Sequence, residues 1–500
     1  MMMTTTLKRG AGILFPVTAL PSPYGIGTLG KEAFEFVDFL KEAGQSFWQV
    51  LPVGPTSYGD SPYQSFSAFA GNPYMIDLDA LIEEGILDRG AVNDRFWGND
   101  PGRVAYDVMF QNRFPVLRAA FAGSHLEEDE GYRAFCADQS FWLEDYSLYM
   151  ACKTYFGNQE WPLWDKDIKF RKSEAVAKYS RLLKEDMEFW KFCQYKFYGQ
   201  WEKLHRYANE RGISLIGDVP IYMALDSADV WVHPDLFQLD ENLTPIKVAG
   251  VPPDAFSDDG QLWGNPLYDW EAMEAEGFEW WSRRIGAASV LYDVVRFDHF
   301  IGVTQYYTIP FGSSDGKNGE WKKGPGRKLV DVILKAAGDT KVIAEDLGVS
   351  VPEVKQLLAD TGLPGMKIIE FAFGGGSDNE HLPHNYASNC VVYGGTHDNE
   401  TLKGYFLARS DWERGYACRY MGVSNPNDID AIVSAVFRTA YSSVASVAIF
   451  QIQDVLRLDN SARMNQPSTI GGNWSWRLRK GQLGAREKQM LRDLVNLYGR

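Results

Sequence analysis

Short apolar runs alternate with amphipathic segments along the chain, and these runs mark eight predicted strands. They cover residues 11–17, 46–53, 213–221, 291–297, 341–345, 366–371, 390–394 and 444–451. Strands that alternate with helices predict an α/β fold built on a parallel sheet. Most runs end in polar residues, and a barrel collects its active-site residues at the C-terminal ends of several strands.

Helical periodicity fills the gaps between these runs. Residues 31–43 carry apolar side chains at 33, 36, 37, 40 and 43, and Gly44 is a stop signal. Residues 173–209 predict one or two amphipathic helices, and 327–337 and 352–359 follow the fourth and fifth strands. The pattern therefore predicts a (β/α)8 TIM barrel.

Two of the gaps are too long for a bare barrel. About 160 residues separate the second and third strands, and about 70 separate the third and fourth. We expect one catalytic domain over 1–500, with inserted subdomains at 54–205 and 223–288 in loops on the catalytic face. The first insertion is expected to be mixed and partly helical. The second holds a Gly/Pro-rich stretch, 250–260, that reads as a lid or cleft wall, although an ordinary connector fits its composition equally well.

The charge balance narrows the range of partners. The formal net charge of -16, with no long Lys/Arg run, is unfavourable for nucleic acid and for anionic membranes, but does not oppose a neutral ligand such as a sugar. No stretch approaches the ~18 apolar residues of a membrane span. The pattern makes no prediction of oligomeric state.

The cysteines and the N-terminus favour a cytoplasmic protein. Five widely spaced cysteines without a C-x-x-C motif argue against a disulfide framework or a zinc site. The N-terminal stretch has a basic pair before an apolar run, but Pro16 interrupts it and no small-residue cleavage site follows.

The first candidate for chemistry is the end of the fourth predicted strand. Arg296 and Asp298 are two residues apart, so their side chains share a face of the strand. A neighbouring guanidinium favours an ionised carboxylate, which a glycosyl nucleophile requires. A structural salt bridge explains this pair equally well.

The second candidate, Glu345, ends the next strand. Retaining glycosidases hold two carboxyl groups ~5–5.5 Å apart, and neighbouring strands could bring Glu345 close to Asp298. A carboxyl beside an anion resists ionisation, which suits a general acid. Glu345 could instead cap the following helix, as could Asp346.

The third candidate is the turn that contains His397 and Asp398. Such a pair can hold sugar hydroxyls, and a third carboxylate can stabilise positive charge at an anomeric centre; a metal site or a plain turn is the alternative. Of only seven histidines, His299 and His397 both lie beside a candidate aspartate, which makes core filling a poorer explanation.

One motif points to another class of enzyme. Residues 25–30 match G-x-G-x-x-G, but Pro21 and Pro23 stand where a dinucleotide site needs a strand. We interpret the match as a tight loop and keep a nicotinamide enzyme as a remote alternative.

Taken together, the motifs resemble those of the 4-α-glucanotransferases, also called amylomaltases or disproportionating enzymes, of the α-amylase clan. The resemblance runs in order over nearly the whole chain. It is carried by 21–30, 61–65, 71–74, 217–220, 250–270, 296–302, 345–348, 383–386 and 395–400.

The resemblance implies transfer of (1→4)-α-D-glucan segments by a retaining mechanism, with maltooligosaccharides and α-1,4-glucans as substrates. It implies Asp298 as nucleophile, Glu345 as acid/base and Asp398 as the carboxylate that stabilises the transition state. It implies no metal and no cofactor. The implied sugar contacts are Tyr63, Asp218, Gln261, Trp263, Arg296, His299, His397 and, more weakly, Asn465.

Two further functions stay open from sequence. One is an α-amylase-like glucan hydrolase of the same clan. The other is a glucan-binding protein on a barrel that has lost catalysis, although the intact carboxylate trio speaks against it.

Overall fold

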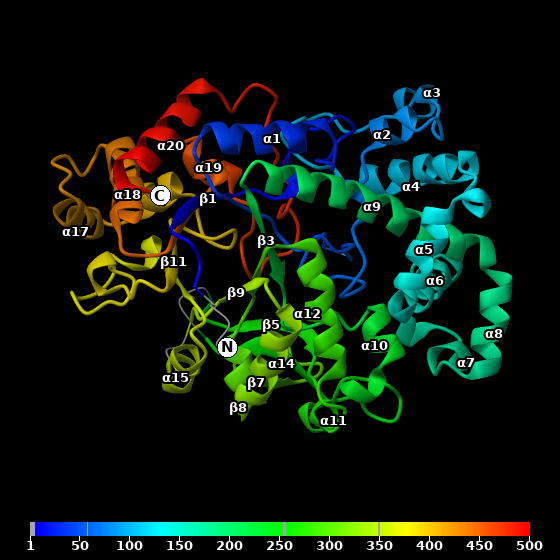
Figure 1. Cartoon of the computed structure of the whole chain (residues 1–500). Coiled ribbons are helices and arrows are strands. Elements are labelled where there is room, and N and C mark those ends of the chain that lie inside the picture. Colours follow the sequence, from blue (N-terminus) through cyan, green and yellow to red (C-terminus); the bar gives the residue numbers. More distant parts are fainter. Residues whose placement is uncertain (1–5, 58, 254–256, 349–350) are drawn as a thin grey trace.

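Eight strands form one parallel sheet at the centre of the computed structural model, which describes residues 6–57, 59–253, 257–348 and 351–500 (Figure 1). All eight predicted strands are confirmed. The strands are β1 (Gly10–Leu14), β2 (Phe47–Gln49), β3 (Ser214–Val219), β6 (Val294–Phe297), β9 (Lys341–Ala344), β10 (Gly365–Ile368), β11 (Cys390–Tyr393) and β12 (Val447–Gln451).

The strand order shows how the sheet curls. It runs β10-β11-β12-β1-β2-β3-β6-β9, with parallel pairing throughout. The two end strands meet where the N–H of Ala344 donates to the carbonyl of Pro364 over 2.9 Å, although no ladder joins β9 to β10 in the described residues. The sheet is therefore a nearly closed (β/α)8 barrel, as predicted.

Helices surround the sheet because each presents an apolar stripe to it. In α1, the buried positions are Ala33, Phe36, Val37 and Leu40, as the periodicity predicts. The surrounding helices are α1 (Lys31–Glu42), α9 (Lys184–Glu210), α12 (Glu279–Leu291), α14 (Arg327–Ala337), α15 (Pro352–Thr361), α18 (Ile429–Ser442) and α20 (Ala485–Tyr498). Shorter helices lie between them: α10 (Ala228–Val232), α11 (Trp270–Ala275), α13 (Ile301–Thr304), α16 (Leu402–Ala408), α17 (Asp411–Met421) and α19 (Ile452–Val455). None of the described helices has the length and apolar character needed to cross a membrane.

The segment between β2 and β3 is built from helices. They are α2 (Leu78–Glu83), α3 (Arg89–Asn93), α4 (Tyr106–Gly123), α5 (Glu130–Asp138), α6 (Ser140–Tyr155), α7 (Lys166–Lys169), α8 (Ser173–Leu182) and the first part of α9. The predicted stretch 173–209 is thus two helices, α8 and α9. The long helix α9 contacts α4, α5 and α6 as well as α1 and β3, so it joins this segment to the barrel.

The structure contains a second, antiparallel sheet that the sequence pattern did not predict. It has the order β5-β4-β7-β8 and consists of β4 (Lys247–Val251), β5 (Gln261–Pro266), β7 (Gln305–Pro310) and β8 (Glu320–Lys323). Half of it comes from the segment before β6 and half from the segment after it. The stretch 250–260 contains the last two residues of β4 and the connection from β4 to β5, and residues 254–256 within it lie outside the described part of the chain.

Candidate active site

Asp298 and Glu345 stand at the same rim of the barrel. Each directly follows the end of its strand, and the last residues of those neighbouring strands, Phe297 of β6 and Ala344 of β9, are register partners. The N–H of Glu345 donates to the carbonyl of Phe297 over 3.0 Å, which fixes the two chain segments side by side. The strand ends therefore present both carboxyl groups at one mouth.

Arg296 holds two carboxylates at once. Its Nη1 lies 2.7 Å from Oδ2 of Asp218 and 2.9 Å from Oδ1 of Asp298. The side chains of Arg296 and Asp218 are 3% and 0% exposed, whereas that of Asp298 is 24% exposed. The buried structural ion pair is thus Arg296–Asp218. Asp298 shares the cation but remains partly exposed to solvent.

Glu345 is held by backbone donors but kept protonated by its surroundings. Its Oε2 accepts the N–H of His299 over 2.7 Å and its Oε1 accepts the N–H of Leu347 over 2.8 Å. Burial raises the pKa of Glu345 to about 8, and the charge of Asp298 adds to the rise while Arg296 opposes it. At neutral pH, Glu345 can therefore donate a proton.

His299, whose N–H donates to Glu345, has an uncommon backbone conformation. Its φ of 51° lies in the left-handed region, which residues with a β-carbon rarely enter. Its ring meets Trp263 edge-on, with centroids 4.8 Å apart, and burial lowers the pKa of His299 to about 4. Trp263 in turn donates its Nε1–H to Oε1 of Gln261 over 3.1 Å, so β5 reaches this side of the site.

Asp398 lies in the turn after β11. Its Oδ1 accepts from Nδ2 of Asn465 over 2.6 Å, and its Oδ2 lies 3.3 Å from Nε2 of His397. Burial raises the pKa of Asp398, but His397 and the Asn465 hydrogen bond outweigh it and bring the pKa down to about 2. Asp398 is therefore an anion at any physiological pH.

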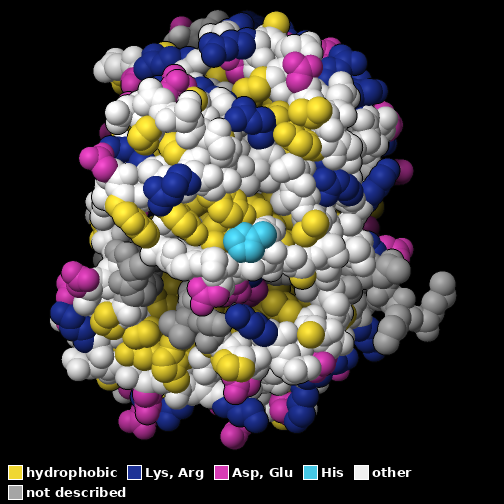
Figure 2. All heavy atoms as spheres, turned by 90° about the vertical axis from the view of Figure 1, so that its left-hand side faces the viewer, with side chains coloured by type: hydrophobic (Ala, Val, Ile, Leu, Met, Phe, Trp, Pro, Cys, Tyr) yellow, Lys and Arg dark blue, Asp and Glu magenta, His cyan; other side chains and the backbone are white. Residues whose placement is uncertain are grey.

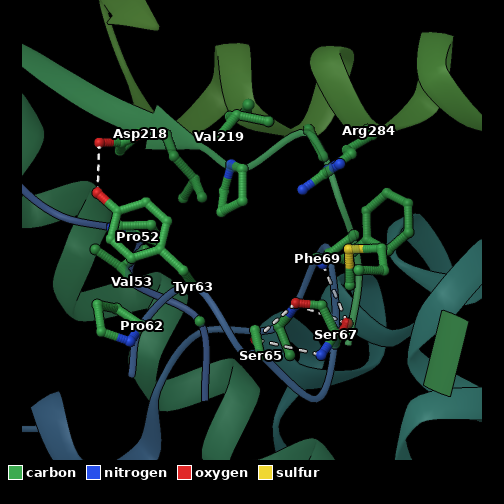
Figure 3. Close-up of a pocket in the computed structure, with 18 of the residues that line it drawn as sticks. Pro52, Val53, Pro62, Tyr63, Ser65, Ser67, Phe69, Asp218, Val219 and Arg284 are labelled. Carbon is green, nitrogen blue, oxygen red and sulfur yellow. Dashed lines mark hydrogen bonds between the residues drawn. The ribbon is translucent and has the colours of Figure 1, made fainter. Parts of the chain in front are cut away.

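Tyr63 contacts both Asp218 and His397. Its hydroxyl donates to Oδ2 of Asp218 over 2.9 Å (Figure 3). Its ring stacks on that of His397, with the ring centroids 5.1 Å apart. Behind Tyr63 and Asp218 lies a cavity of about 60 Å³, which Figure 3 shows between them and Arg284. Neither Asp298 nor Glu345 lines it.

All eleven residues named from the sequence belong to one of two series of direct contacts. One series of contacts runs Gln261–Trp263–His299–Glu345, and the other runs Asp298–Arg296–Asp218–Tyr63–His397–Asp398–Asn465. The electrostatic coupling between Asp298 and Glu345 connects the two series.

Two residues of the site have no sequence signal that we recognised. The ring of Trp474 lies 5.8 Å from both Tyr63 and His397. Arg463 donates from Nη2 to the carbonyl of Asp398 over 2.6 Å and from Nε to the carbonyl of Asn465 over 2.7 Å. Both come from the long loop after β12, where neither periodicity nor a motif marks them.

The structure also bears on cofactors. Within the described ranges, no group of three or more His, Cys, Asp or Glu is arranged to hold a metal ion. The glycines of the G-x-G-x-x-G match face the protein itself: a β-carbon on Gly27 would lie 1.8 Å from the carbonyl oxygen of Val17, and one on Gly30 would lie 2.0 Å from Oδ2 of Asp77. The match is a packed loop, and it offers no support for the nicotinamide alternative.

Comparison with known proteins agrees with this geometry. Residues 15–483 match the family model described as 4-alpha-glucanotransferase. The 4-alpha-glucanotransferase of Clostridium butyricum is 48% identical over 97% of this chain and 99% of its own length, and that of Thermus thermophilus is 46% identical over 98% of each. The solved amylomaltase from Streptococcus agalactiae, in complex with acarbose, is 43% identical, with a TM-score of 0.95 over 99% of this chain and 100% of that one. The chain therefore belongs to the 4-alpha-glucanotransferase family.

Proposed function

We propose that this enzyme transfers a segment of a (1→4)-α-D-glucan to the 4-hydroxyl of glucose or another glucan, with Asp298 as nucleophile and Glu345 as acid/base. The observation that carries the assignment is the pairing at the rim: an aspartate ion-paired with Arg296 on one strand, and a largely protonated glutamic acid on its neighbour. Retaining glycosidases use such a pair.

The reaction proceeds in two displacements. An oxygen of Asp298 attacks the anomeric carbon, the bond to the leaving 4-oxygen breaks, and Glu345 gives that oxygen its proton. The 4-hydroxyl of the acceptor then attacks the resulting glucosyl ester, Glu345 takes up the acceptor's proton, and Asp298 leaves as a carboxylate. Two inversions at the same carbon restore the α configuration.

The other residues of the site have proposed roles that follow from their charge and shape. Asp398, with its lowered pKa, stabilises the positive charge that develops at the anomeric carbon. Arg296 keeps Asp298 in place. The remaining members offer hydrogen-bonding groups or ring faces to glucose units: Tyr63, Asp218, Gln261, Trp263, His299, His397 and Asn465.

Transfer and hydrolysis are separated by the products from maltotriose. We expect glucose together with a ladder of longer maltooligosaccharides, because an acceptor hydroxyl replaces water in the second displacement. Chromatography of the products over time provides the measurement. Maltose and glucose as the only products would establish the hydrolase alternative instead.

The pKa of Glu345 predicts the alkaline side of the pH profile. Because Glu345 must carry a proton to act as the acid, kcat/KM for maltotriose should fall about tenfold per pH unit above about pH 8. A pH series of initial rates measures this limb. With α-maltotriosyl fluoride, whose leaving group needs no proton, the limb should be absent from kcat/KM; an identical limb with both donors would contradict the assignment.

Further features support the proposed partners, location and domain layout. On the face that carries α15, α17 and α18, Lys and Arg side chains are interspersed with Asp and Glu, and hydrophobic side chains gather around a histidine (Figure 2). This face has no continuous basic area for nucleic acid.

The five cysteines are all free, which supports a cytoplasmic location. We retain 54–205 and 223–288 as inserted subdomains of one catalytic domain, with 250–260 as a lid or cleft wall.

A further inference from the structure

Glu370 is a buried carboxyl group that the mechanism above does not use. It follows β10 and is 4% exposed. Its N–H donates to the carbonyl of Gly394 over 3.2 Å, and its carbonyl accepts the hydroxyl of Tyr405 over 2.6 Å. The backbone of Glu370 is thus fixed against the segments on both sides of the turn that contains Asp398.

The side chain of Glu370 is hydrogen-bonded to Asn399, the neighbour of Asp398. Oδ1 of Asn399 accepts from the N–H of Thr396 over 2.9 Å and from its hydroxyl over 2.8 Å. The hydroxyl oxygen of Thr396 in turn accepts the N–H of Asp398 over 3.4 Å. An unbroken series of contacts therefore leads from Glu370 to the backbone that presents His397 and Asp398.

The fit between Glu370 and the turn is close. A β-carbon on Gly395 would lie 2.7 Å from Oε1 of Glu370 and 3.0 Å from Cβ of Asn399. Only a residue without a side chain allows the carboxyl to lie directly beneath the turn. The same Oε1 has no hydrogen-bond partner among the described residues.

The charge state of Glu370 agrees with a supporting role. Burial raises the pKa of Glu370 well above its ordinary value, and Asp454 and Glu400 raise it further. A neutral carboxyl beneath the turn does not repel Asp398. Burying a carboxyl is unfavourable, and an apolar side chain of the same size would fill the space without that cost.

We propose that Glu370 is a positioning residue, which through Asn399 sets the place of the turn that presents His397 and Asp398 to the sugar. The inference rests on the proposed function, because it assumes that Asp398 acts on the transition state. Glu370 itself touches no reacting atom.

The test compares two variants of similar size. E370Q keeps an oxygen that can accept from Asn399, and E370L does not. E370L should lower kcat about 10–100-fold, the range typical of residues that orient a functional group, with little change in KM for maltotriose. E370Q should retain kcat within about threefold of the unsubstituted enzyme. Equal losses in the two variants, or a normal kcat in E370L, would overturn the proposal.

Two further variants separate positioning from general damage. Asp454 is another buried carboxyl of the same cluster; it accepts the N–H of Leu402 over 2.7 Å, and its Oδ2 has no partner among the described residues. D454L should lower the thermal unfolding temperature yet keep kcat well above that of E370L. N399L should lower kcat like E370L, and the double variant should lose little more than either single one. Additive losses would contradict a shared route.

Asp398→Asn, measured in parallel, separates the proposed role of Asp398 from the proposed role of Glu370. Retained activity in D398N would remove the proposed role of Asp398, on which the role of Glu370 depends. Loss of activity in D398N together with a normal kcat in E370L would leave the proposed function intact and remove the positioning role.

Discussion

Asp298→Asn should reduce glucan transfer by on the order of 10⁴-fold or more, because an amide oxygen cannot form the glucosyl ester that the first displacement requires. The fold should persist, since Arg296 keeps its buried partner Asp218 at 2.7 Å. Initial rates of glucose release from maltotriose and a thermal unfolding curve measure the two halves of this prediction. Near-normal transfer by D298N would remove Asp298 from its role.

A smaller substitution at the same position identifies the role chemically. In D298A, azide can enter from the side that the aspartate occupied and attack the anomeric carbon of α-maltotriosyl fluoride. The expected product is the β-glycosyl azide, which NMR distinguishes from the α anomer. Formation of the α-azide would show that another nucleophile had acted first.

Glu345→Gln should lower kcat/KM for maltotriose about 10²–10⁴-fold, which is the usual contribution of a general acid. With α-maltotriosyl fluoride, the first displacement should remain fast, because fluoride leaves without a proton. The second displacement lacks its base, so the covalent glucosyl-enzyme should accumulate. Mass spectrometry of the quenched enzyme, followed by peptide mapping, should find the added sugar on Asp298.

The matched control for E345Q is E345D, which retains an acid on a shorter side chain. It should recover part of the rate with maltotriose and should not accumulate the glucosyl-enzyme. An E345Q variant that is equally impaired with both donors would indicate that Glu345 shapes the site without transferring a proton.

The barrel was predictable because its strands are locally distinctive. β6, β11 and β12 are buried over their whole length, so each leaves an apolar run bounded by polar residues. The antiparallel sheet left no such signal. Three of the four residues of β8 are exposed and β5 alternates in burial, so their sequences resemble those of loops. The pairing of β4 with β7 also spans the whole of β6, a distance that local periodicity does not register.

The candidate site also has residues that the sequence predicts and residues that it does not. Arg296, Asp298 and Glu345 lie at strand ends, where spacing predicts that they share a rim, and Asp398 was predicted from its place in the turn after a strand. Trp474 and Arg463 reach the site from a loop, through contacts that only the folded chain creates. The sequence did not predict a role for Glu370, because a polar residue shortly after a strand is a common feature. Its hydrogen bond to Asn399, which only the folded chain creates, is what indicates a positioning role.

The barrel has one gap between neighbouring strands, and its position matters for the two carboxyl groups at the rim. Seven ladders tie the eight strands into a ring, and the described residues of β9 and β10 are bridged instead by the one bond from Ala344 to Pro364. The gap lies between β10 and β9, the strand that Glu345 follows, whereas a ladder joins β3, which contains Asp218, to β6, which Asp298 follows. The ladder between β6 and β9 is also complete, so Asp298 and Glu345 follow two strands that are held together, and the gap does not separate them.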